Sequence, residues 1–390
     1  MGRLNTRTLL SRLQKVGMAS RAELAKSLGM SQPTAGRIAD ELLELGVLEE
    51  VTTQDVTDSR WNESPRNSAS RLGRPGRLLR LDSRRPRFLA IQLDVTNTSF
   101  GLLPVGFKGE DRWEFEIPTP DSEKKLVEVL RMAAAKIPQK DFWGVLVSVP
   151  GIVHESAGKV LFSPNLHWTE EINLSRQFQN VWKAPVVLVQ EEQALALGHL
   201  SVGRVAEDFM LVDFGESVGG SVILEGKLFS NALPISGELG HTPVLGNRRL
   251  CGCGAIGCME SLVSIHGLLQ SFAESRGAGA ESSWPALVRY VEIEGVTPWL
   301  AQALDAAATS IAGALNVLGL RQVVITGSLA ELPAGVINYF FEAIKRGTLW
   351  ARFGRVKCET AARRRMAGLV AVGIDRILIS LAESSAEEMA

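Results

Sequence analysis

The apolar residues of the first 46 positions recur with the period of α-helices. Their spacing over about residues 5–16 predicts a first helix. Ser20 begins a second helix with a capping-box pattern, and Gly29 is placed to end it. Ser31 begins a third helix, which extends to Gly46. The pattern therefore predicts three short helices at the start of the chain.

The second and third of these helices are joined by a tight glycine turn. This is typical of a helix-turn-helix, whose second helix lies in the major groove of DNA with its N-terminal residues at the base edges. The alternative is a helical hairpin that packs on the rest of the chain. If the helix binds DNA, the residues that we expect to contact it are Ser31, Gln32, Thr34 and Arg37.

Two short apolar segments follow, Val47–Val51 and Arg77–Leu81, and they read as a pair of strands. The polar segment between them turns at Gly73–Gly76, where Arg74 is held on a rigid Gly/Pro turn. An arginine presented in this way suits a narrow minor groove, where the negative potential is greatest. The segment therefore predicts a winged helix-turn-helix, with Arg74 and Arg77 added to the DNA contacts.

The rest of the chain repeats one order of elements. A meander of strands followed by a helix and a further strand occurs once near residues 88–149 and again from about residue 209. This repetition is consistent with a duplicated, two-lobed α/β fold. The segments that we expect to be strands are 88–95, 99–107, 113–117, 142–149, 186–189, 209–212, 218–224 and 322–326, and the expected helices are 126–135, 192–202, 299–318, 334–346 and 363–381.

The two parts of the chain differ in charge. The 390 residues carry a formal net charge of −1, yet residues 1–90 hold six more basic than acidic side chains and the remainder seven more acidic than basic. This asymmetry favours a nucleic-acid partner for the first part. There is no apolar run near the ~20 residues of a membrane span, and no apolar core of a signal peptide near the start. These observations predict a cytoplasmic protein without a membrane partner.

A cluster of cysteines predicts a metal site. Cys251, Cys253 and Cys258 fall within eight residues, and His241 lies ten residues before the first of them. Three Cys and one His are a standard ligand set for a structural, tetrahedral zinc ion. The glycines between the cysteines let a short loop bring the thiolates around one ion. We therefore expect one structural Zn²⁺ per chain; the alternative is three buried thiols and a surface histidine.

The motif C-x-C-G-x-x-G-C-x-E, preceded by E-x-G-H, resembles the signature of the ROK family of sugar kinases and sugar-responsive repressors. The resemblance implies two lobes of the actin-like ATPase (ribonuclease H-like) type with a cleft between them. The segment S-R-A-E-L-A-K-S-L-G-M-S and the later G-R-P resemble the DNA-binding domain of ROK repressors. The expected domains are then a winged helix-turn-helix with its linker over 1–87, and a ROK domain over 88–390 with its zinc loop at 238–260.

The same resemblance implies a sugar site. Ser163-Pro164-Asn165-Leu166 resembles the P-N-L of the family, and Gln190-Glu191 stands at its N-D pair. Carboxylates and amides suit a polyol because they pair with its hydroxyl groups. The alternative is that these side chains only support the zinc loop. The residues that we expect to bind a sugar are Asn165, Gln190, Glu191, Glu238, His241 and Glu260.

The nucleotide side departs from the kinases of the family. Their first phosphate loop, D-x-G-G-T, is Asp94–Thr98 here, and both glycines are absent. Their second loop, G-T-G, is Gly215-Glu216-Ser217 here, and the charge of Glu216 would repel phosphate. The glycine-rich adenosine segment reads Thr326-Gly327-Ser328, and Glu191 replaces the catalytic aspartate with a longer side chain. Since phosphoryl transfer depends on positioned phosphate ligands, we expect no enzyme activity.

Together these features predict a transcriptional regulator of the ROK type. We expect it to repress carbohydrate-metabolism genes, to bind operator DNA as a homodimer or higher homo-oligomer, and to respond to a sugar or a sugar-derived ligand. Two alternatives remain open. One is an ATP-dependent sugar kinase with an added DNA-binding domain, and the other is a repressor that a partner protein controls.

Overall fold

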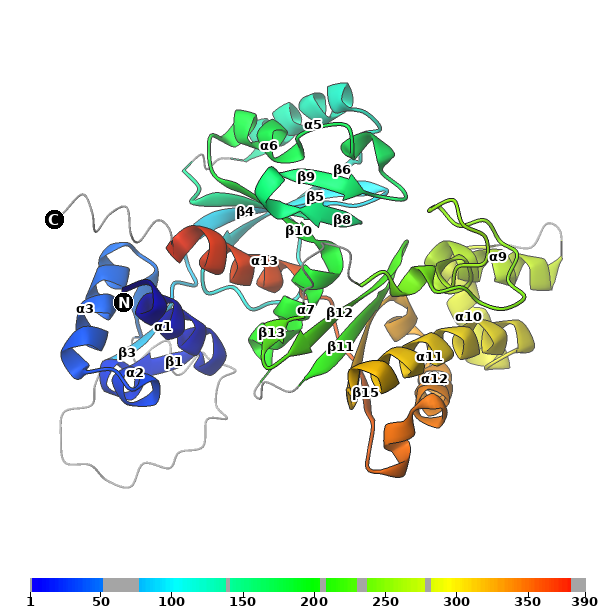
Figure 1. Cartoon of the computed structure of the whole chain (residues 1–390). Helices are drawn as coiled ribbons and strands as arrows, with labels where there is room; N and C mark the ends of the chain where they lie inside the picture. The colour runs from blue at the N-terminus through cyan, green and yellow to red at the C-terminus, as the bar shows by residue number, and fades with distance from the viewer. Residues whose placement is uncertain are drawn as a thin grey trace.

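The first three helices pack on a small antiparallel sheet. The computed structural model describes residues 2–51, 77–137, 141–203, 208–229, 237–277 and 282–379. In its first part, the helices α1 (Gly2–Val16), α2 (Arg21–Leu28) and α3 (Gln32–Glu44) cover a sheet of order β1-β3-β2 (Figure 1). The strands of this sheet are β1 (Met18–Ser20), β2 (Leu48–Glu50) and β3 (Leu78–Leu81).

The local signals at these helix ends are confirmed. The Ser20 hydroxyl accepts from the backbone N–H of Glu23, and the Glu23 carboxylate accepts from the backbone N–H of Ser20. Gly29 ends α2 with a left-handed φ of 63°, which favours glycine. The two predicted strands at 47–51 and 77–81 are confirmed as β2 and β3, whereas β1 is too short to leave a periodic signal. The wing tip at 73–76, with Arg74, lies outside the described residues.

The first lobe, coloured cyan to green in Figure 1, has a five-stranded sheet of order β10-β7-β4-β5-β6. The helices α5 (Glu123–Lys136) and α6 (Leu174–Trp182) cover one face, and α7 (Glu191–Val202) and α13 (Arg365–Gly373) cover the other. Its strands are β4 (Pro86–Leu93), β5 (Asn97–Pro104), β6 (Phe115–Pro118), β7 (Gly144–Val149) and β10 (Val186–Gln190), with a separate pair of β8 (Ile152–His154) and β9 (Lys159–Phe162).

The second lobe repeats the strand order of the first. Its sheet runs β15-β14-β11-β12-β13, so both lobes pair an antiparallel meander with two further parallel strands. This confirms the predicted duplication. The elements are β11 (Phe209–Phe214), β12 (Val218–Leu224), β13 (Lys227–Leu228), β14 (Gln322–Gly327) and β15 (Lys357–Thr360), with α8 (Glu260–Val263), α9 (Ile265–Arg276), α10 (Trp284–Glu294), α11 (Pro298–Leu318) and α12 (Ala334–Gly347).

The helices α7 and α13 pack very closely against each other. A Cβ atom at Gly198 would lie 1.9 Å from the carbonyl oxygen of Arg364, and one at Gly368 would lie 1.7 Å from that of Ala194. Only glycine fits at such a close approach. The predicted helix 363–381 is too long at its start, because α13 begins at Arg365, and it becomes a π-helix at Ile374–Leu378.

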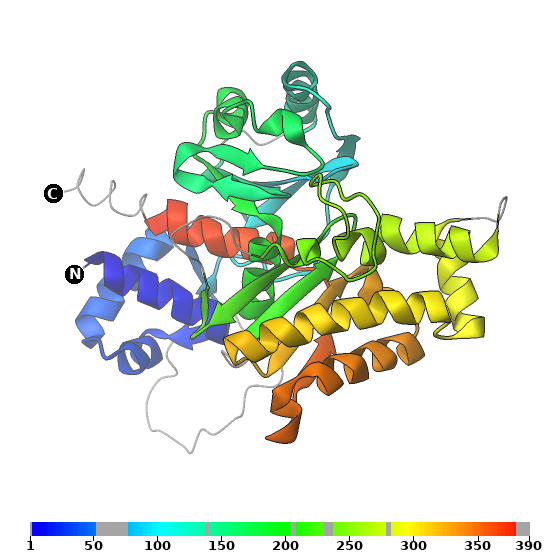
Figure 2. The same cartoon turned by 45° about the vertical axis from the view of Figure 1, so that its right-hand side comes forward.

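The N-terminal part, which we call the head (residues 2–51 and 77–82), packs on the first lobe beside α13 (Figures 1 and 2). One buried apolar cluster joins residues of α1, such as Leu9, to residues of β4 and α13. Lys108, in the β5–β6 connection, donates to the backbone carbonyl of Gln14, and Arg7 pairs with Asp375. None of the helices in the described ranges combines the length and apolar content of a membrane span.

Candidate metal centre and effector cleft

The four predicted metal ligands converge on one point. Their donor atoms all lie within 4.8 Å of one another. Sγ of Cys251 is 3.5 Å from Nδ1 of His241, and Sγ of Cys253 is 3.7 Å from Sγ of Cys258. In tetrahedral zinc sites the bond lengths place two sulfurs ~3.8 Å apart, and a sulfur and a nitrogen ~3.6 Å apart. The donor set and its spacing therefore fit a zinc ion.

The backbone of the loop is shaped by glycine. Gly254 and Gly257 have φ of 86° and 93°, in the region that other residues rarely adopt. Burial raises the pKa of the Cys251 and Cys258 thiols. A cation is what would make such sulfurs thiolates, because a coordinating thiol is deprotonated by its metal. When bound, zinc would hold the loop in place, with His241, Cys251, Cys253 and Cys258 as its ligands.

His241 connects this cluster to a cavity between the two lobes. Its Nδ1 faces the sulfurs, while its Nε2 is 3.5 Å from Oε2 of Glu238. The zinc loop also abuts Asn165, since a Cβ atom at Gly252 would lie 3.0 Å from Oδ1 of that side chain. A metal at the cluster would thus fix two of the side chains that line the cavity.

The structure brings four of the six predicted sugar residues to this cavity, whose volume is about 30 Å³. They are Asn165, Glu238, His241 and Glu260. Glu260 accepts at 2.9 Å from the backbone N–H of Val218, which orients its carboxylate. Gln190 is not among the lining side chains, but its amide donates to Oε1 of Glu238 at 3.3 Å.

Glu191 takes a different place from the one predicted. It is not among the residues lining the cavity; its carboxylate is buried and pairs with Arg365 at the start of α13. Burial raises the pKa of Glu191 to about 7, against the opposing effect of the Arg365 guanidinium. The next residue, Glu192, faces the cavity in its place. The sugar-binding role predicted for Glu191 is therefore not supported by its position.

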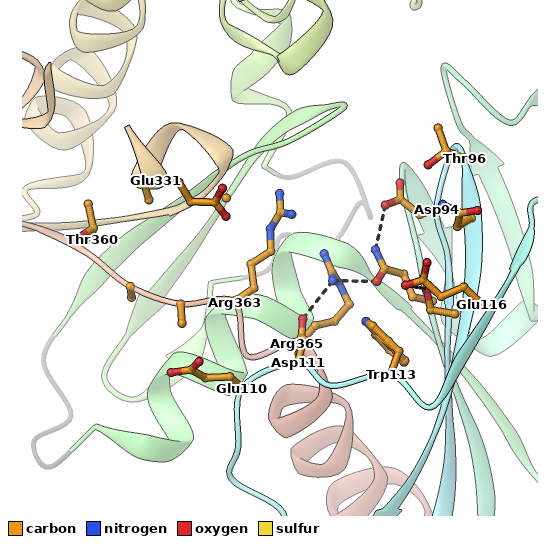
Figure 3. Close-up of a pocket in the computed structure, with 17 residues that line it drawn as sticks. Asp94, Thr96, Glu110, Asp111, Trp113, Glu116, Glu331, Thr360, Arg363 and Arg365 are labelled. Atoms are coloured by element: carbon orange, nitrogen blue, oxygen red, sulfur yellow. Dashed lines mark hydrogen bonds and ion pairs between the residues drawn. The ribbon is translucent and has the colours of Figure 1, made fainter. Parts of the chain in front are cut away.

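A larger cavity of about 610 Å³ lies where the resemblance placed the nucleotide (Figure 3). Its lining includes Thr96 and Asn97 from the β4–β5 turn. Glu216, predicted to repel phosphate here, is exposed and is not among the lining residues. Other carboxylates line the cavity and outnumber its two arginines, Arg363 and Arg365; they are Asp94, Glu110, Asp111, Glu116 and Glu331. This charge disfavours a triphosphate.

Arg363 lies close to both of the remaining glycine loops. Its guanidinium bonds in bidentate fashion to Asp213, at 2.8 and 2.7 Å. A Cβ atom at Gly215 would lie 2.6 Å from Nη2 of this arginine, and one at Gly327 would lie 2.7 Å from the same atom. Burial acts to raise the pKa of Asp213, but Arg363 lowers it below its usual range. An arginine–aspartate pair thus occupies the place implied for phosphate.

Arg365 holds a second buried network beside the first. Besides Glu191, its guanidinium donates to Oε1 of Gln92 at 2.9 Å and to Oδ2 of Asp111 at 3.1 Å (Figure 3). Asp111 also accepts from the backbone N–H of Met366 at 2.8 Å. Sequence reasoning missed Arg363, Arg365 and Asp111. No local motif marks them, because their partners are 150 or more residues away in the chain.

The predicted DNA contacts of the head lie at the start of α3 and the base of the wing. Ser31 caps α3, its hydroxyl 2.7 Å from that of Thr34, while the side chains of Gln32 and Arg37 are exposed. Arg37 pairs with Glu41. Arg77 is exposed and donates to Glu50 at 2.6 Å. Arg74, the remaining predicted contact, is outside the described residues.

The fold and cleft define a class of two-lobed α/β proteins that includes sugar kinases and regulators. The ROK family profile matches residues 88–369, and the chain belongs to this family. It is 25% identical to the xylose repressor of Caldicellulosiruptor bescii, over 93% of this chain and 92% of that protein. It is also 25% identical to the glucokinase of Halalkalibacterium halodurans, over 47% of this chain and 59% of the kinase.

One solved structure shares the fold over nearly the whole chain. The crystal structure of a ROK family transcriptional regulator, a homolog of the E. coli MLC protein, superposes with a TM-score of 0.72 at 18% identity, covering 98% of each chain. The similar proteins thus include repressors and sugar kinases, and the match to the repressor extends through the head while that to the glucokinase spans about half of this chain.

Proposed function

We propose that this protein is a sugar-responsive transcriptional repressor that does not phosphorylate its ligand. The observation that carries the proposal is the contrast between the two cavities of one cleft. The cavity at the zinc loop keeps Asn165, Glu238, His241 and Glu260, whereas the nucleotide position holds the Arg363–Asp213 pair. A protein that keeps a sugar site and fills its phosphate site can still bind an effector.

In this proposal residues 1–87 form a winged helix-turn-helix and residues 88–390 form the effector domain. Support comes from the exposed start of α3 and from the β2–β3 pair that follows it. The position of α3 after a glycine turn is that of a recognition helix. A homodimer would present two such helices to a two-fold operator. One structural Zn²⁺ per chain, on the Cys₃His cluster, would hold the effector site in shape.

The effector would reach the head through α7 and α13. The first residues of α7 contact both the small cavity and Arg365, and Arg365 is joined to Asp111 in the β5–β6 connection. The same connection reaches α1 through Lys108. A ligand can shift the head only by its differential affinity for two arrangements of these elements. We propose that closure of the lobes changes that arrangement and so releases DNA.

Arg37→Ala is expected to weaken binding to an operator by ~1–3 kcal/mol, because an arginine at this position of a recognition helix contacts a base or a phosphate. The measurement is fluorescence anisotropy with a DNA sequence that the full-length protein selects from a random library. Arg131→Ala, an exposed arginine on α5, is the matched control. Equal affinities of the two variants, with no loss against the unaltered protein, would refute the proposed role of α3.

The rival enzyme function predicts ATP binding and ADP release. We expect neither at millimolar ATP with magnesium, because carboxylates and the Arg363–Asp213 pair occupy the phosphate position. The measurements are calorimetry with ATP and a coupled ADP assay over a panel of sugars. ADP release in proportion to added sugar, at ~1 per second or faster, would identify a kinase instead.

The second rival is a repressor that a partner protein controls, with an unused sugar cavity. A thermal-shift screen of the full-length protein against hexoses, amino sugars and pentoses separates this rival from the proposal. We expect at least one sugar to raise the unfolding temperature and to release the selected DNA. A screen without any shift would favour a protein effector.

A further inference from the structure

Two of the residues that line the small cavity each carry a buried polar atom without a hydrogen-bond partner. Within the described residues, Oε2 of Glu192 and Oγ of Ser163 have no such partner. The Glu192 side chain is 7% exposed and Ser163 is 1% exposed, and both line the cavity between the lobes. Burying a polar group without a partner is unfavourable, so two such atoms at one cavity indicate a ligand group that pairs with both.

The described lining of the cavity is rich in carboxylates, and its one basic side chain is His241. Three carboxylates, those of Glu192, Glu238 and Glu260, face it, and its described lining contains no lysine or arginine. Glu260 accepts from the backbone N–H of Val218 and Glu238 from the Gln190 amide. Burial raises the pKa of Glu192 well above its usual range, and the Glu191 carboxylate adds to the effect. Burial therefore favours the neutral form of Glu192, and a cation bound in the cavity would favour the carboxylate.

The backbone holds Glu192 against the cavity wall. A Cβ atom at Gly219 would lie 2.3 Å from Oε1 of Glu192, so the carboxyl lies directly against the backbone of Gly219 and a larger residue there would displace it. The enclosed volume is about 30 Å³, whereas one water-sized group needs ~10–15 Å³. The space therefore suits a single small group at the end of a larger ligand, whose remainder would extend into the cleft.

We propose that this cavity is an amine subsite, and that the effector is a polyol carrying a primary ammonium group, as amino sugars do. An ammonium group supplies three N–H donors and one positive charge. It would donate to Oε2 of Glu192 and to Oγ of Ser163, with a third bond left for another carboxylate. A hydroxyl group supplies one donor and no charge, so it gives the buried Glu192 carboxyl no charge-assisted hydrogen bond. The inference rests on the proposed function, because it assumes that the cleft binds an effector.

The test is calorimetry of the full-length, zinc-loaded protein with matched ligands. The pairs are glucosamine with glucose, mannosamine with mannose, and galactosamine with galactose; the N-acetylated sugars serve as uncharged controls. We expect the amine of at least one pair to bind ~10–100-fold more tightly than its neutral partner, since a charge-assisted hydrogen bond is stronger than a neutral one. Glu192→Gln should reduce this ratio to near one.

Ser163→Ala provides a second variant that leaves the charge unchanged. It should weaken binding of the amine by ~5-fold through the loss of one hydrogen bond. Zinc content and thermal unfolding of both variants show whether they are folded. If a neutral sugar binds as tightly as its amine, and Glu192→Gln changes neither, the amine subsite is refuted while the proposed function stands.

Two other outcomes also refute the inference. If calcium alone saturates the site and Glu192→Gln abolishes that binding, the cavity holds an inorganic cation. If no sugar of the panel binds and none releases the selected DNA, the proposed sugar response fails together with the amine subsite. In that case the binding of the Arg37→Ala variant to DNA still tests whether the protein is a DNA-binding regulator.

Discussion

Cys253→Ala is expected to lose the zinc ion, reducing the metal content of purified protein from about one per chain to near zero. The cluster has four donor atoms, which lie within 4.8 Å of one another, and Sγ of Cys253 is one of the four. The free energy of binding a structural zinc ion is also free energy of folding, with apparent values of ~10–16 kcal/mol in zinc-finger peptides. Loss of the ion should therefore unfold the loop locally.

The local effect can be measured by hydrogen exchange. We expect faster exchange over 238–260. We also expect weaker effector binding, because the same loop carries His241, which lines the cavity, and Gly252, which abuts Asn165. The matched control is Cys358→Ala. Cys358 lies in β15, away from the cluster, and burial raises the pKa of its thiol to about 11. Cys253→Ala protein with full zinc occupancy would contradict the assignment.

Arg365→Met is expected to destabilise the protein by ~3–5 kcal/mol, which is typical when one partner of a buried ion pair is removed. The side chain of Arg365 is 3% exposed and pairs with Glu191 and Asp111. Methionine has a similar length but leaves both carboxylates without a positive partner. The measurement is the midpoint of chemical denaturation at neutral pH.

An exposed arginine provides the control. Arg346, whose side chain is 63% exposed, lies 3.8 Å from Asp305, and Arg346→Met should change stability by only ~0–1 kcal/mol. Adding Glu191→Met to Arg365→Met should recover part of the loss, because it removes a buried unpaired charge. Equal effects of Arg365→Met and Arg346→Met would show that the buried network does not stabilise the fold.

The loss of stability caused by Arg365→Met should increase as pH rises. The pKa of Glu191 is raised to about 7 in the folded protein even with Arg365 present, and removal of this arginine raises it further. A carboxyl whose folded pKa exceeds its unfolded value stabilises the fold at low pH, and that contribution is lost as pH rises through the folded pKa. The deficit of Arg365→Met should therefore be larger at pH 8 than at pH 5.5.

The sequence alone predicted the cluster of candidate metal ligands and the helices of the head. The four ligands fall within eighteen consecutive residues, 241–258, so glycine turns within one loop are enough to bring them together. The capping box at Ser20 and the glycine at position 29 act through neighbours three or four residues away. Signals of this kind are local, and they do not depend on how distant segments pack.

Only the tertiary structure decided which glutamate faces the effector cavity. Glu191 and Glu192 are consecutive in α7, and side chains one residue apart on a helix point ~100° away from each other. Which of them meets the cavity depends on the rotation of α7, which is set where Gly198 and Gly368 allow close packing on α13. Nothing in the sequence around residue 191 contains that information.

The tertiary structure also decided where Arg363 and Arg365 lie. Arg363 meets Asp213 across 150 residues and Arg365 meets Glu191 across 174. Their side chains enter the cleft because α13 begins at Arg365, two residues later than the periodicity predicts, and Arg363 precedes the helix. Missing glycines in the expected phosphate loops predicted the loss of nucleotide binding, whereas the residues that line this position became visible only in the packed lobes.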